Sequence, residues 1–171
     1  MNSEEPLAHS AKPEQGIPPQ TYVKHISGVM KRATENVSGM IRYFSGDTRV
    51  LQEAVKRAAL LHDLGKLDKA NQTVLKKGGK KHLSLNHVDA GTTCLSRGKE
   101  YEAAFFVYGH HIGLCSVPQE AGRGTLFLRD EKICNEIDQK LENYLADHEA
   151  WYGKIDKSSN ETVKSGWTGL T

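Results

Sequence analysis

The sequence predicts an all-α protein, a bundle of about five or six helices. Apolar residues recur at steps of three and four along several segments, and this spacing is typical of a helix with one buried face. The strict alternation of apolar and polar residues that would indicate a strand is not convincing in any segment. With 171 residues, 37% of them apolar and 26% charged, the chain 1–171 is expected to form a single globular domain with a real core.

The first part of the chain is expected to hold an extended lead-in and two helices. Residues 1–19 contain four prolines and show no helical period. Apolar periodicity predicts a first helix over residues 20–44 and a second over residues 49–64, with Asp47 or Thr48 as the N-cap of the second. The last turns of the second helix are apolar on all sides, so we expect them to run into the interior.

A lysine-rich segment follows, over residues 66–86, and is expected to form a mobile basic loop. A solvated loop is the ordinary interpretation of such a composition. The functional interpretation is a flap that contacts phosphates, since lysine without interleaved aromatic residues suits contact with a nucleic-acid backbone. Both interpretations stay open at this point. The candidate DNA-binding residues are Lys76, Lys77, Lys80 and Lys81.

The second half of the chain is expected to hold three more helices. Periodicity predicts helices over residues 86–96, 99–110 and 129–151, the first of them beginning near His87. The small residues Ala90-Gly91 are expected to allow close packing on a neighbouring element. Residues 113–128 are rich in glycine and are expected to form a loop.

Composition excludes some classes of function. No apolar run approaches the roughly 20 residues of a membrane span, so no membrane partner is expected. The polar, acidic first residues do not resemble a signal peptide, and the odd number of cysteines suits reduced thiols, so we expect a cytoplasmic protein. A formal charge of +2 is mildly basic, which neither requires nor repels phosphate-bearing partners.

The dipeptide His62-Asp63 is the first candidate site, because an apolar run carries it towards the interior. A buried charged carboxylate must be paired or must bind a cation. Adjacent histidine and aspartate can ligate one ion if the chain bends, and Gly65 is expected to permit that bend through its backbone freedom. The dipeptide alone is weak evidence for a metal site. It becomes stronger evidence if other histidines of the chain lie beside it.

Four separate places in the chain supply histidines at or near predicted helix ends. A lone histidine is more often a satisfied core or surface residue, but four such placements favour a metal centre. Imidazole and carboxylate suit Mn, Fe, Co, Ni or Zn, and the set is too rich in nitrogen for a dedicated Mg²⁺ cage, although Mg²⁺ stays a candidate. The set suits one ion or two, and two ions bridged by Asp63 would use all of its members. The candidate ligands are His25, His62, Asp63, His87, His110 and His111.

The order of these motifs resembles the HD-domain metal-dependent phosphohydrolases. More narrowly, the chain is similar to the HD nuclease module of the CRISPR-associated type I helicase-nuclease, over residues from Leu7 to about Leu114. The motifs that carry the likeness are Leu7-Ala8-His9-Ser10, Leu61-His62-Asp63-Leu64-Gly65-Lys66, Asn86-His87-Val88-Asp89-Ala90-Gly91 and Gly109-His110-His111-Ile112-Gly113-Leu114. The likeness implies an all-α helical bundle around a metal cleft.

The resemblance also implies roles for these residues. A first metal would be held by His25, His62 and Asp63, and a second by His87, His110 and His111 with Asp63 as the bridge. Asp63 and Lys66 would be the catalytic residues, with Lys66 facing the scissile phosphate or positioning the water. The activity implied is endonucleolytic cleavage of single-stranded DNA, fed by a helicase domain or subunit that an RNA-guided surveillance complex recruits. For His9 and Ser10 the motif implies packing or hydrogen bonding to a ligand.

One expected segment is missing from this chain. The family carries a further aspartate on a late helix, and it completes the first metal site. The closing residues Gly166–Thr171 resemble the stretch that precedes that helix, so we expect a chain cut short and lacking its last helices. Two alternatives to the nuclease stay open. They are an HD phosphohydrolase that acts on a small nucleotide, and a metal-poor, inactive domain that only docks a partner.

Overall fold

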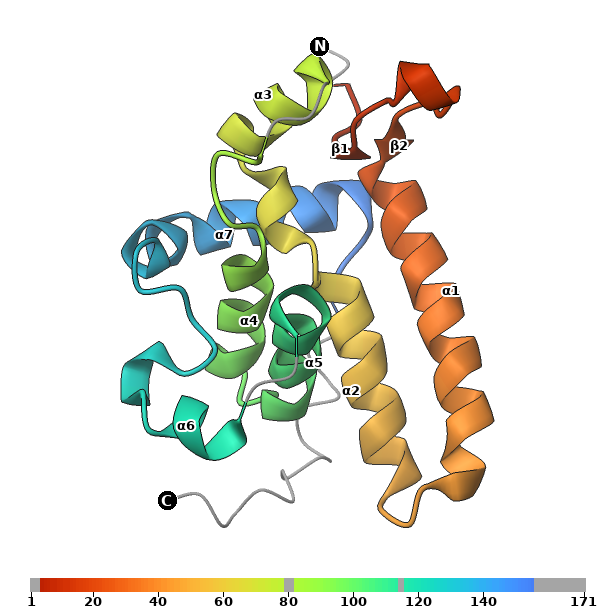
Figure 1. The fold of residues 1–171 in the computed structure, drawn as a ribbon, viewed down its shortest axis with the longest axis vertical. Coiled ribbons are helices and arrows are strands. Elements are labelled where there is room, and N and C mark those ends of the chain that lie inside the picture. The colour runs from red at the N-terminus through yellow and green to blue at the C-terminus, as the bar shows by residue number, and fades with distance from the viewer. Residues whose placement is uncertain (1–3, 79–81, 114–115, 156–171) are drawn as a thin grey trace.

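The all-α prediction is confirmed by a computed structural model, which describes residues 4–78, 82–113 and 116–155. These residues contain short 3-10 turns, seven α-helices and one small hairpin of two strands (Figure 1). The strands are β1 (Leu7–His9) and β2 (Gln20–Thr21). The helices are α1 (Tyr22–Met40), α2 (Thr48–Leu61), α3 (Lys69–Lys77), α4 (Val88–Arg97), α5 (Tyr101–Ile112), α6 (Val117–Ala121) and α7 (Cys134–Trp151).

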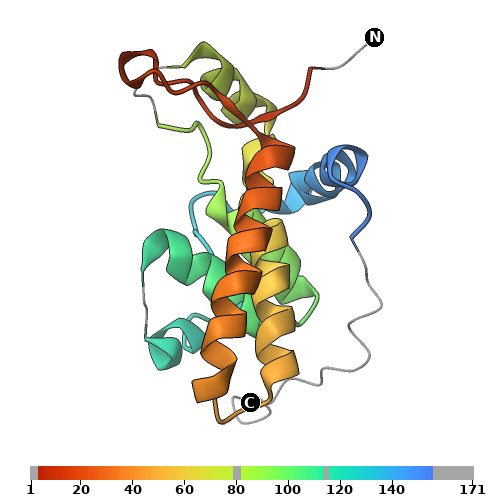
Figure 2. The same ribbon diagram turned by 90° about the vertical axis from the view of Figure 1, so that its right-hand side faces the viewer.

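The long helices α1 and α2 lie side by side and antiparallel, joined by a tight connection (Figures 1 and 2). Asp47 caps α2, as its side chain accepts hydrogen bonds from the backbone N–H groups of Arg49 and Val50. Helices α4 and α5 pack on each other and on α2, and α7 crosses α4. The core at this junction is made of fully buried side chains that include Leu61, Leu64, Leu95, Val107, Ile137 and Leu141. Among the described helices, none combines the length and the apolarity that a membrane crossing requires.

The lead-in is extended, as predicted, but it also forms the hairpin that the sequence did not indicate. Strand β1 pairs antiparallel with β2, with His9 opposite Gln20. Between the strands, Lys12 N–H donates to the carbonyl oxygen of Ile17 at 2.9 Å. Strands of three and two residues are too short to show an alternating pattern, which is why periodicity missed them.

The prediction of a basic loop over residues 66–86 is wrong for most of its length. Residues 64–67 form a 3-10 turn and residues 69–77 form α3. Asp68 caps this helix, since its carboxylate accepts a hydrogen bond from Ala70 N–H at 2.8 Å. Lys76 and Lys77 therefore lie on the last turn of a helix, where a cation is favourable. Lys80 and Lys81 lie outside the described residues.

The segment after α5 also differs from its prediction. Residues 113–128 contain the short helix α6 and a 3-10 turn rather than loop alone, and the last helix begins at Cys134 instead of residue 129. Residues 129–133 leave the helix because Arg129 turns inward to an ion pair with Asp89 of α4. Leu114 and the closing residues Gly166–Thr171, on which two sequence-based expectations depend, lie outside the described residues.

Candidate metal centre

The His62-Asp63 step lies in the interior, at the point where α2 ends. His62 is the C-cap of α2, and Asp63 leaves helical geometry before the 3-10 turn that follows. The two side chains are 4% and 1% exposed, which places a carboxylate in the core as the apolar run predicts. A carboxylate this deeply buried requires cationic partners or an ion.

Gly65 is needed at this step for its size and not for its backbone angles. The expectation that it uses a conformation reserved for glycine is wrong, because its φ is not among the positive values in the described chain. A Cβ atom at Gly65 would lie 2.5 Å from the carbonyl oxygen of His87. Gly91 is equally constrained, since a Cβ atom there would collide with the carbonyl oxygen of Leu61. These two glycines let α4 approach the end of α2, which brings His87 to Asp63.

The two carboxylate oxygens of Asp63 face different sets of side chains. On one side, Oδ2 lies 2.9 Å from His25 Nε2, 3.4 Å from His62 Nε2 and 2.8 Å from Lys66 Nζ. These neighbours come from α1, from the end of α2 and from the turn after it. We call His25, His62 and Asp63 Oδ2 the first half-site.

On the other side, Oδ1 lies 3.5 Å from His87 Nε2 and 3.9 Å from His111 Nε2. His87 precedes α4, and His111 belongs to the last turn of α5. One ligand atom from each of Asp63, His87 and His111 lies within 4.8 Å of the others, which is compact enough to hold a metal ion. We call this group the second half-site.

Hydrogen bonds fix which nitrogen of two histidines faces the carboxylate. His62 Nδ1 lies 2.9 Å from the carbonyl oxygen of Ala59, which can only accept, so Nδ1 carries the proton. His25 Nδ1 lies 3.3 Å from Gln20 Oε1 and donates to it. In the neutral rings, the Nε2 lone pairs of His25 and His62 therefore converge beside Asp63, 3.1 Å apart. Converging lone pairs beside a carboxylate are the electrostatic environment that a cation satisfies.

The pKa values of the cluster also suit metal binding. Burial alone would raise the pKa of Asp63, but His25, His62 and Lys66 outweigh burial and hold it well below its usual range. Burial lowers the pKa of His87 and of His111 to about 4, with like charges nearby adding to the effect. At neutral pH Asp63 is thus ionised and the rings of His87 and His111 are neutral, which are the forms that ligate metals.

Several buried polar atoms at the centre lack a well-formed hydrogen bond. Both oxygens of Asp63 are in this state, since the neighbouring histidines and Lys66 lie close without good hydrogen-bond geometry, and so is His111 Nε2. Unsatisfied buried polar atoms are rare and require an explanation such as a missing ion. The buried histidine and aspartate groups could hold a metal ion, and the donor set fits a divalent transition metal.

Not every predicted site residue joins these two groups. The ring of His110 packs edge-on against His62 and His111, at 5.8 and 4.8 Å between centroids, but His110 is exposed and belongs to neither compact ligand group. Lys66 is 6% exposed and lies against Asp63. A cavity of about 420 Å³ contacts both half-sites as well as His110 and Lys66. His9 also lines this cavity, where the sequence indicated packing or hydrogen bonding to a ligand.

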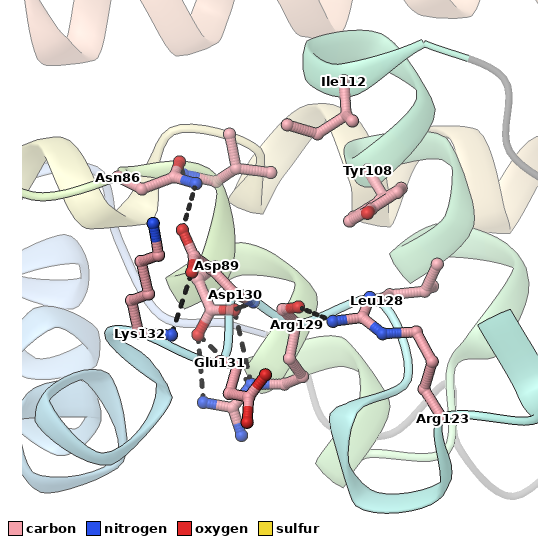
Figure 3. A pocket seen from close by; sticks show the side chains of 11 residues that line it. Asn86, Asp89, Tyr108, Ile112, Arg123, Leu128, Arg129, Asp130, Glu131 and Lys132 are labelled. Atoms are coloured by element: carbon pink, nitrogen blue, oxygen red, sulfur yellow. Dashed lines mark hydrogen bonds and ion pairs between the residues drawn. The ribbon is translucent and has the colours of Figure 1, made fainter.

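A polar network behind the second half-site holds the segment that carries His87. The side chain of Asn86 accepts a hydrogen bond from Val88 N–H at 3.1 Å. It also donates one to Asp130 Oδ2 at 3.3 Å (Figure 3). Asp130 N–H donates to Asp89 Oδ1 at 2.7 Å. The chain around His87 is therefore fixed from the far side of α4.

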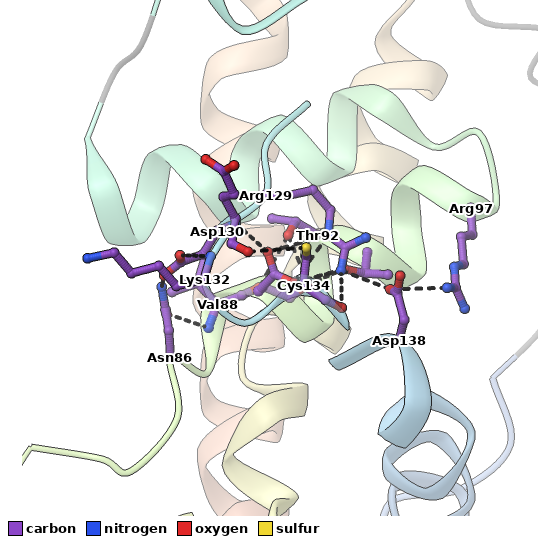
Figure 4. Close-up of polar contacts among 12 residues, drawn as sticks. Asn86, Val88, Thr92, Arg97, Arg129, Asp130, Lys132, Cys134 and Asp138 are labelled. Carbon is purple, nitrogen blue, oxygen red and sulfur yellow. Dashed lines mark hydrogen bonds and ion pairs between the residues drawn. The ribbon is translucent and has the colours of Figure 1, made fainter. Parts of the chain in front are cut away.

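Arg129 is the centre of this network. Its Nη2 lies 3.0 Å from Asp89 Oδ2 and 2.8 Å from Asp138 Oδ1, so it joins α4 to α7 (Figure 4). Burial opposes its charge, but its hydrogen bonds to the two carboxylates raise the pKa of Arg129 above its ordinary value. No sequence pattern indicated this network, because charged residues in such segments are ordinarily exposed to solvent.

Comparisons with protein-family models, with curated proteins and with solved structures found no match for this chain. The metal centre therefore stands on the geometry of its own residues.

Proposed function

We propose that this protein is a divalent-metal-dependent phosphodiesterase that cleaves single-stranded DNA in CRISPR interference, as its motifs imply. The observation that carries the proposal is that the two carboxylate oxygens of Asp63 each face a separate set of histidines. A bridging carboxylate between two nitrogen-rich half-sites is typical of a centre for two metal ions. When bound, such ions lower the pKa of a shared water and stabilise charge on a phosphoryl oxygen.

The protein's own residues prepare this centre. Asp63 is kept ionised by His25, His62 and Lys66, and Ala59 and Gln20 orient the rings of His62 and His25. Lys66 contributes a buried ammonium group beside the cavity. From there it would orient the scissile phosphate, whose negative charge it complements.

The lining of the cavity supports a nucleic-acid backbone as substrate. Among the described residues, no Phe, Tyr or Trp lines the cavity at the metal centre, and its rings are histidines grouped around Asp63. The last turn of α3, with Lys76 and Lys77, borders the neighbouring cavity, which shares Leu75 with the first. Lys76 Nζ lies 2.9 Å from Glu4 Oε2 at this cavity, so a strand leaving the metal centre in this direction would meet Lys77 and would compete with Glu4 for Lys76.

The test is cleavage of a circular single-stranded DNA in the presence of Mn²⁺ or Ni²⁺. A circular substrate has no ends, so its cleavage reports an endonuclease. We expect nicking by the wild-type chain and by His82→Gln, an exposed histidine outside the ligand groups, and none by Asp63→Asn. Intact DNA in the wild-type reaction, or equal cleavage by Asp63→Asn, would refute the proposal.

One observation supports the second candidate, a phosphohydrolase that acts on a small nucleotide. An apolar cavity of about 160 Å³ reaches the same centre from the other side, where Phe106 and Val107 line it together with His62 and His110. The flat face of a nucleobase would suit this apolar lining. Phosphate release from a panel of nucleotides, with the DNA left intact, would favour this candidate over the nuclease.

A further inference from the structure

We propose that His9 is a metal ligand, supplied to the first half-site by the N-terminal hairpin. The inference depends on the metal centre in the proposed function and adds a residue to it. Its basis is geometric, since one ligand atom from each of His9, His25 and Asp63 lies within 4.8 Å of the others. These three atoms form a group as compact as that of the second half-site.

The pairing of the hairpin explains why His9 reaches the centre. His9 on β1 is opposite Gln20 on β2, and Gln20 is the residue whose side chain oxygen holds His25 Nδ1. The ring of His9 meets the ring of His25 edge-on, with centroids 4.7 Å apart and an interplanar angle of 79°. One rung of the hairpin thus orients one ligand of the half-site and places a second beside it.

The backbone of β1 is held firmly on its other edge. Leu7 donates its N–H to Gln72 Oε1 at 2.9 Å, and Gln72 Nε2 donates to the carbonyl oxygen of Leu7 at 2.8 Å. Ser10 Oγ donates to the carbonyl oxygen of Leu75 at 2.8 Å. Strand β1 is therefore fixed to α3 on both sides of His9. Within β1, His9 is the exposed residue, and it lines the metal cavity.

The donor set of the first half-site shows what His9 would add to it. His25, His62 and Asp63 supply three donors to the first half-site, and His9 would supply a fourth. A neutral nitrogen as the fourth donor adds no negative charge and makes the site richer in nitrogen. We therefore expect it to prefer Mn²⁺, Co²⁺, Ni²⁺ or Zn²⁺ and to bind Mg²⁺ poorly.

The test measures metal binding rather than cleavage. In a His87→Gln/His111→Gln background the second half-site is disabled, so calorimetric titration with Co²⁺ reports on the first. Adding His9→Gln should weaken Co²⁺ binding by about tenfold or more, a typical effect of removing a supporting group at a metal site. Adding His82→Gln instead, the matched control, should leave the affinity unchanged.

A rescue variant separates ligation from a structural role. His9→Asp restores a donor at the same position and should recover most of the lost affinity, together with the visible absorption of bound Co²⁺. Circular dichroism checks that the hairpin variants keep their helix content, which main-chain and Gln72 contacts of β1 should preserve. Equal affinity of the His9→Gln protein and its parent would overturn the inference, as would failure of His9→Asp to recover binding.

The outcome also separates this inference from the proposed function. A wild-type chain that binds no metal in the same titration would overturn both. Metal binding that depends on His9, without cleavage of DNA or release of phosphate, would support the ligand and refute the proposed function.

Discussion

Replacing Arg129 by methionine should destabilise the protein more than the loss of an exposed ion pair would. Arg129→Met keeps most of the apolar stem but removes the guanidinium, which leaves Asp89 without its cationic partner. Asp89 is 2% exposed, and Arg129 contacts it through both Nε and Nη2, at 3.2 and 3.0 Å. The remaining hydrogen bonds to this carboxylate, from Asp130 N–H and Thr93 Oγ1, cannot neutralise the buried charge.

The magnitude follows from the burial of this pair. Removing one partner of a buried ion pair costs about 3–5 kcal/mol, because the other charge stays uncompensated. Arg97 provides the matched control, since it pairs with Asp138 at 3.0 Å but its side chain is 51% exposed. Arg97→Met should cost less than about 1 kcal/mol. In the double variant Arg129→Met/Asp89→Asn no buried charge remains, so about 2 kcal/mol or more of the loss should be recovered.

Urea denaturation followed by circular dichroism measures these free energies of unfolding. The prediction requires that Arg129→Met lose clearly more stability than Arg97→Met. The interpretation fails if the two variants have similar free energies of unfolding. It also fails if the effects of Arg129→Met and Asp89→Asn simply add, because additive effects would mean that the two side chains do not interact.

Three further predictions concern other parts of the molecule. Burial lowers the pKa of His148 to about 4 from an ordinary value of about 6.5, so the unfolded chain takes up a proton that the native state refuses, and stability should fall as pH drops from 6.5 to 5. His148→Gln, which keeps an acceptor for Tyr22, should reduce that fall by roughly 1.5 kcal/mol, whereas parallel stability curves would contradict this cause. Gly91→Ala should cost about 1–3 kcal/mol in urea denaturation through its collision with the end of α2, and a cost below about 0.5 kcal/mol would show that the helices separate freely. Lys76→Gln/Lys77→Gln should lower the slope of log affinity for single-stranded DNA against log salt by about 1.4, and an unchanged slope would exclude both lysines from DNA binding.

The sequence could predict the helices that have a wide apolar face, together with the end of α2. Apolar periodicity located α1, α2, α4 and α5 within a few residues, and the apolar run before His62-Asp63 led to the interior as expected. The meeting of His25, His87 and His111 at Asp63 follows from histidines placed near helix ends. Each of these signals is local in the chain, and short-range periodicity is enough to carry it.

The parts that could not be predicted depend on contacts between distant segments. Helix α3 has only Asn71 and Leu75 buried, so its composition resembles that of a loop. The approach of His9 to His25 depends on a hairpin too short to have a pattern. The role of Gly65 also depends on a distant segment, because the atom it makes room for belongs to His87.

His148 is a further residue that sequence reasoning missed. It lies in the last part of α7, fully buried, and its Nδ1 is 3.0 Å from the hydroxyl of Tyr22 at the start of α1. Nothing near it in the sequence separates it from an exposed histidine of a charged helix. Its contact with Tyr22, from a distant part of the chain, shows that it is an interior residue outside the metal centre.

Anomalous diffraction from crystals soaked in Mn²⁺, with Asp63→Asn crystals as the control, tests most directly whether Asp63 bridges two metal ions. We expect two anomalous peaks in the wild-type protein, one beside each carboxylate oxygen of Asp63, with His25 and His62 near one and His87 and His111 near the other. The Asp63→Asn crystals should lose both peaks or show them strongly weakened. No anomalous peak at Asp63, or peaks that persist unchanged in the variant, would contradict a metal centre bridged by this carboxylate.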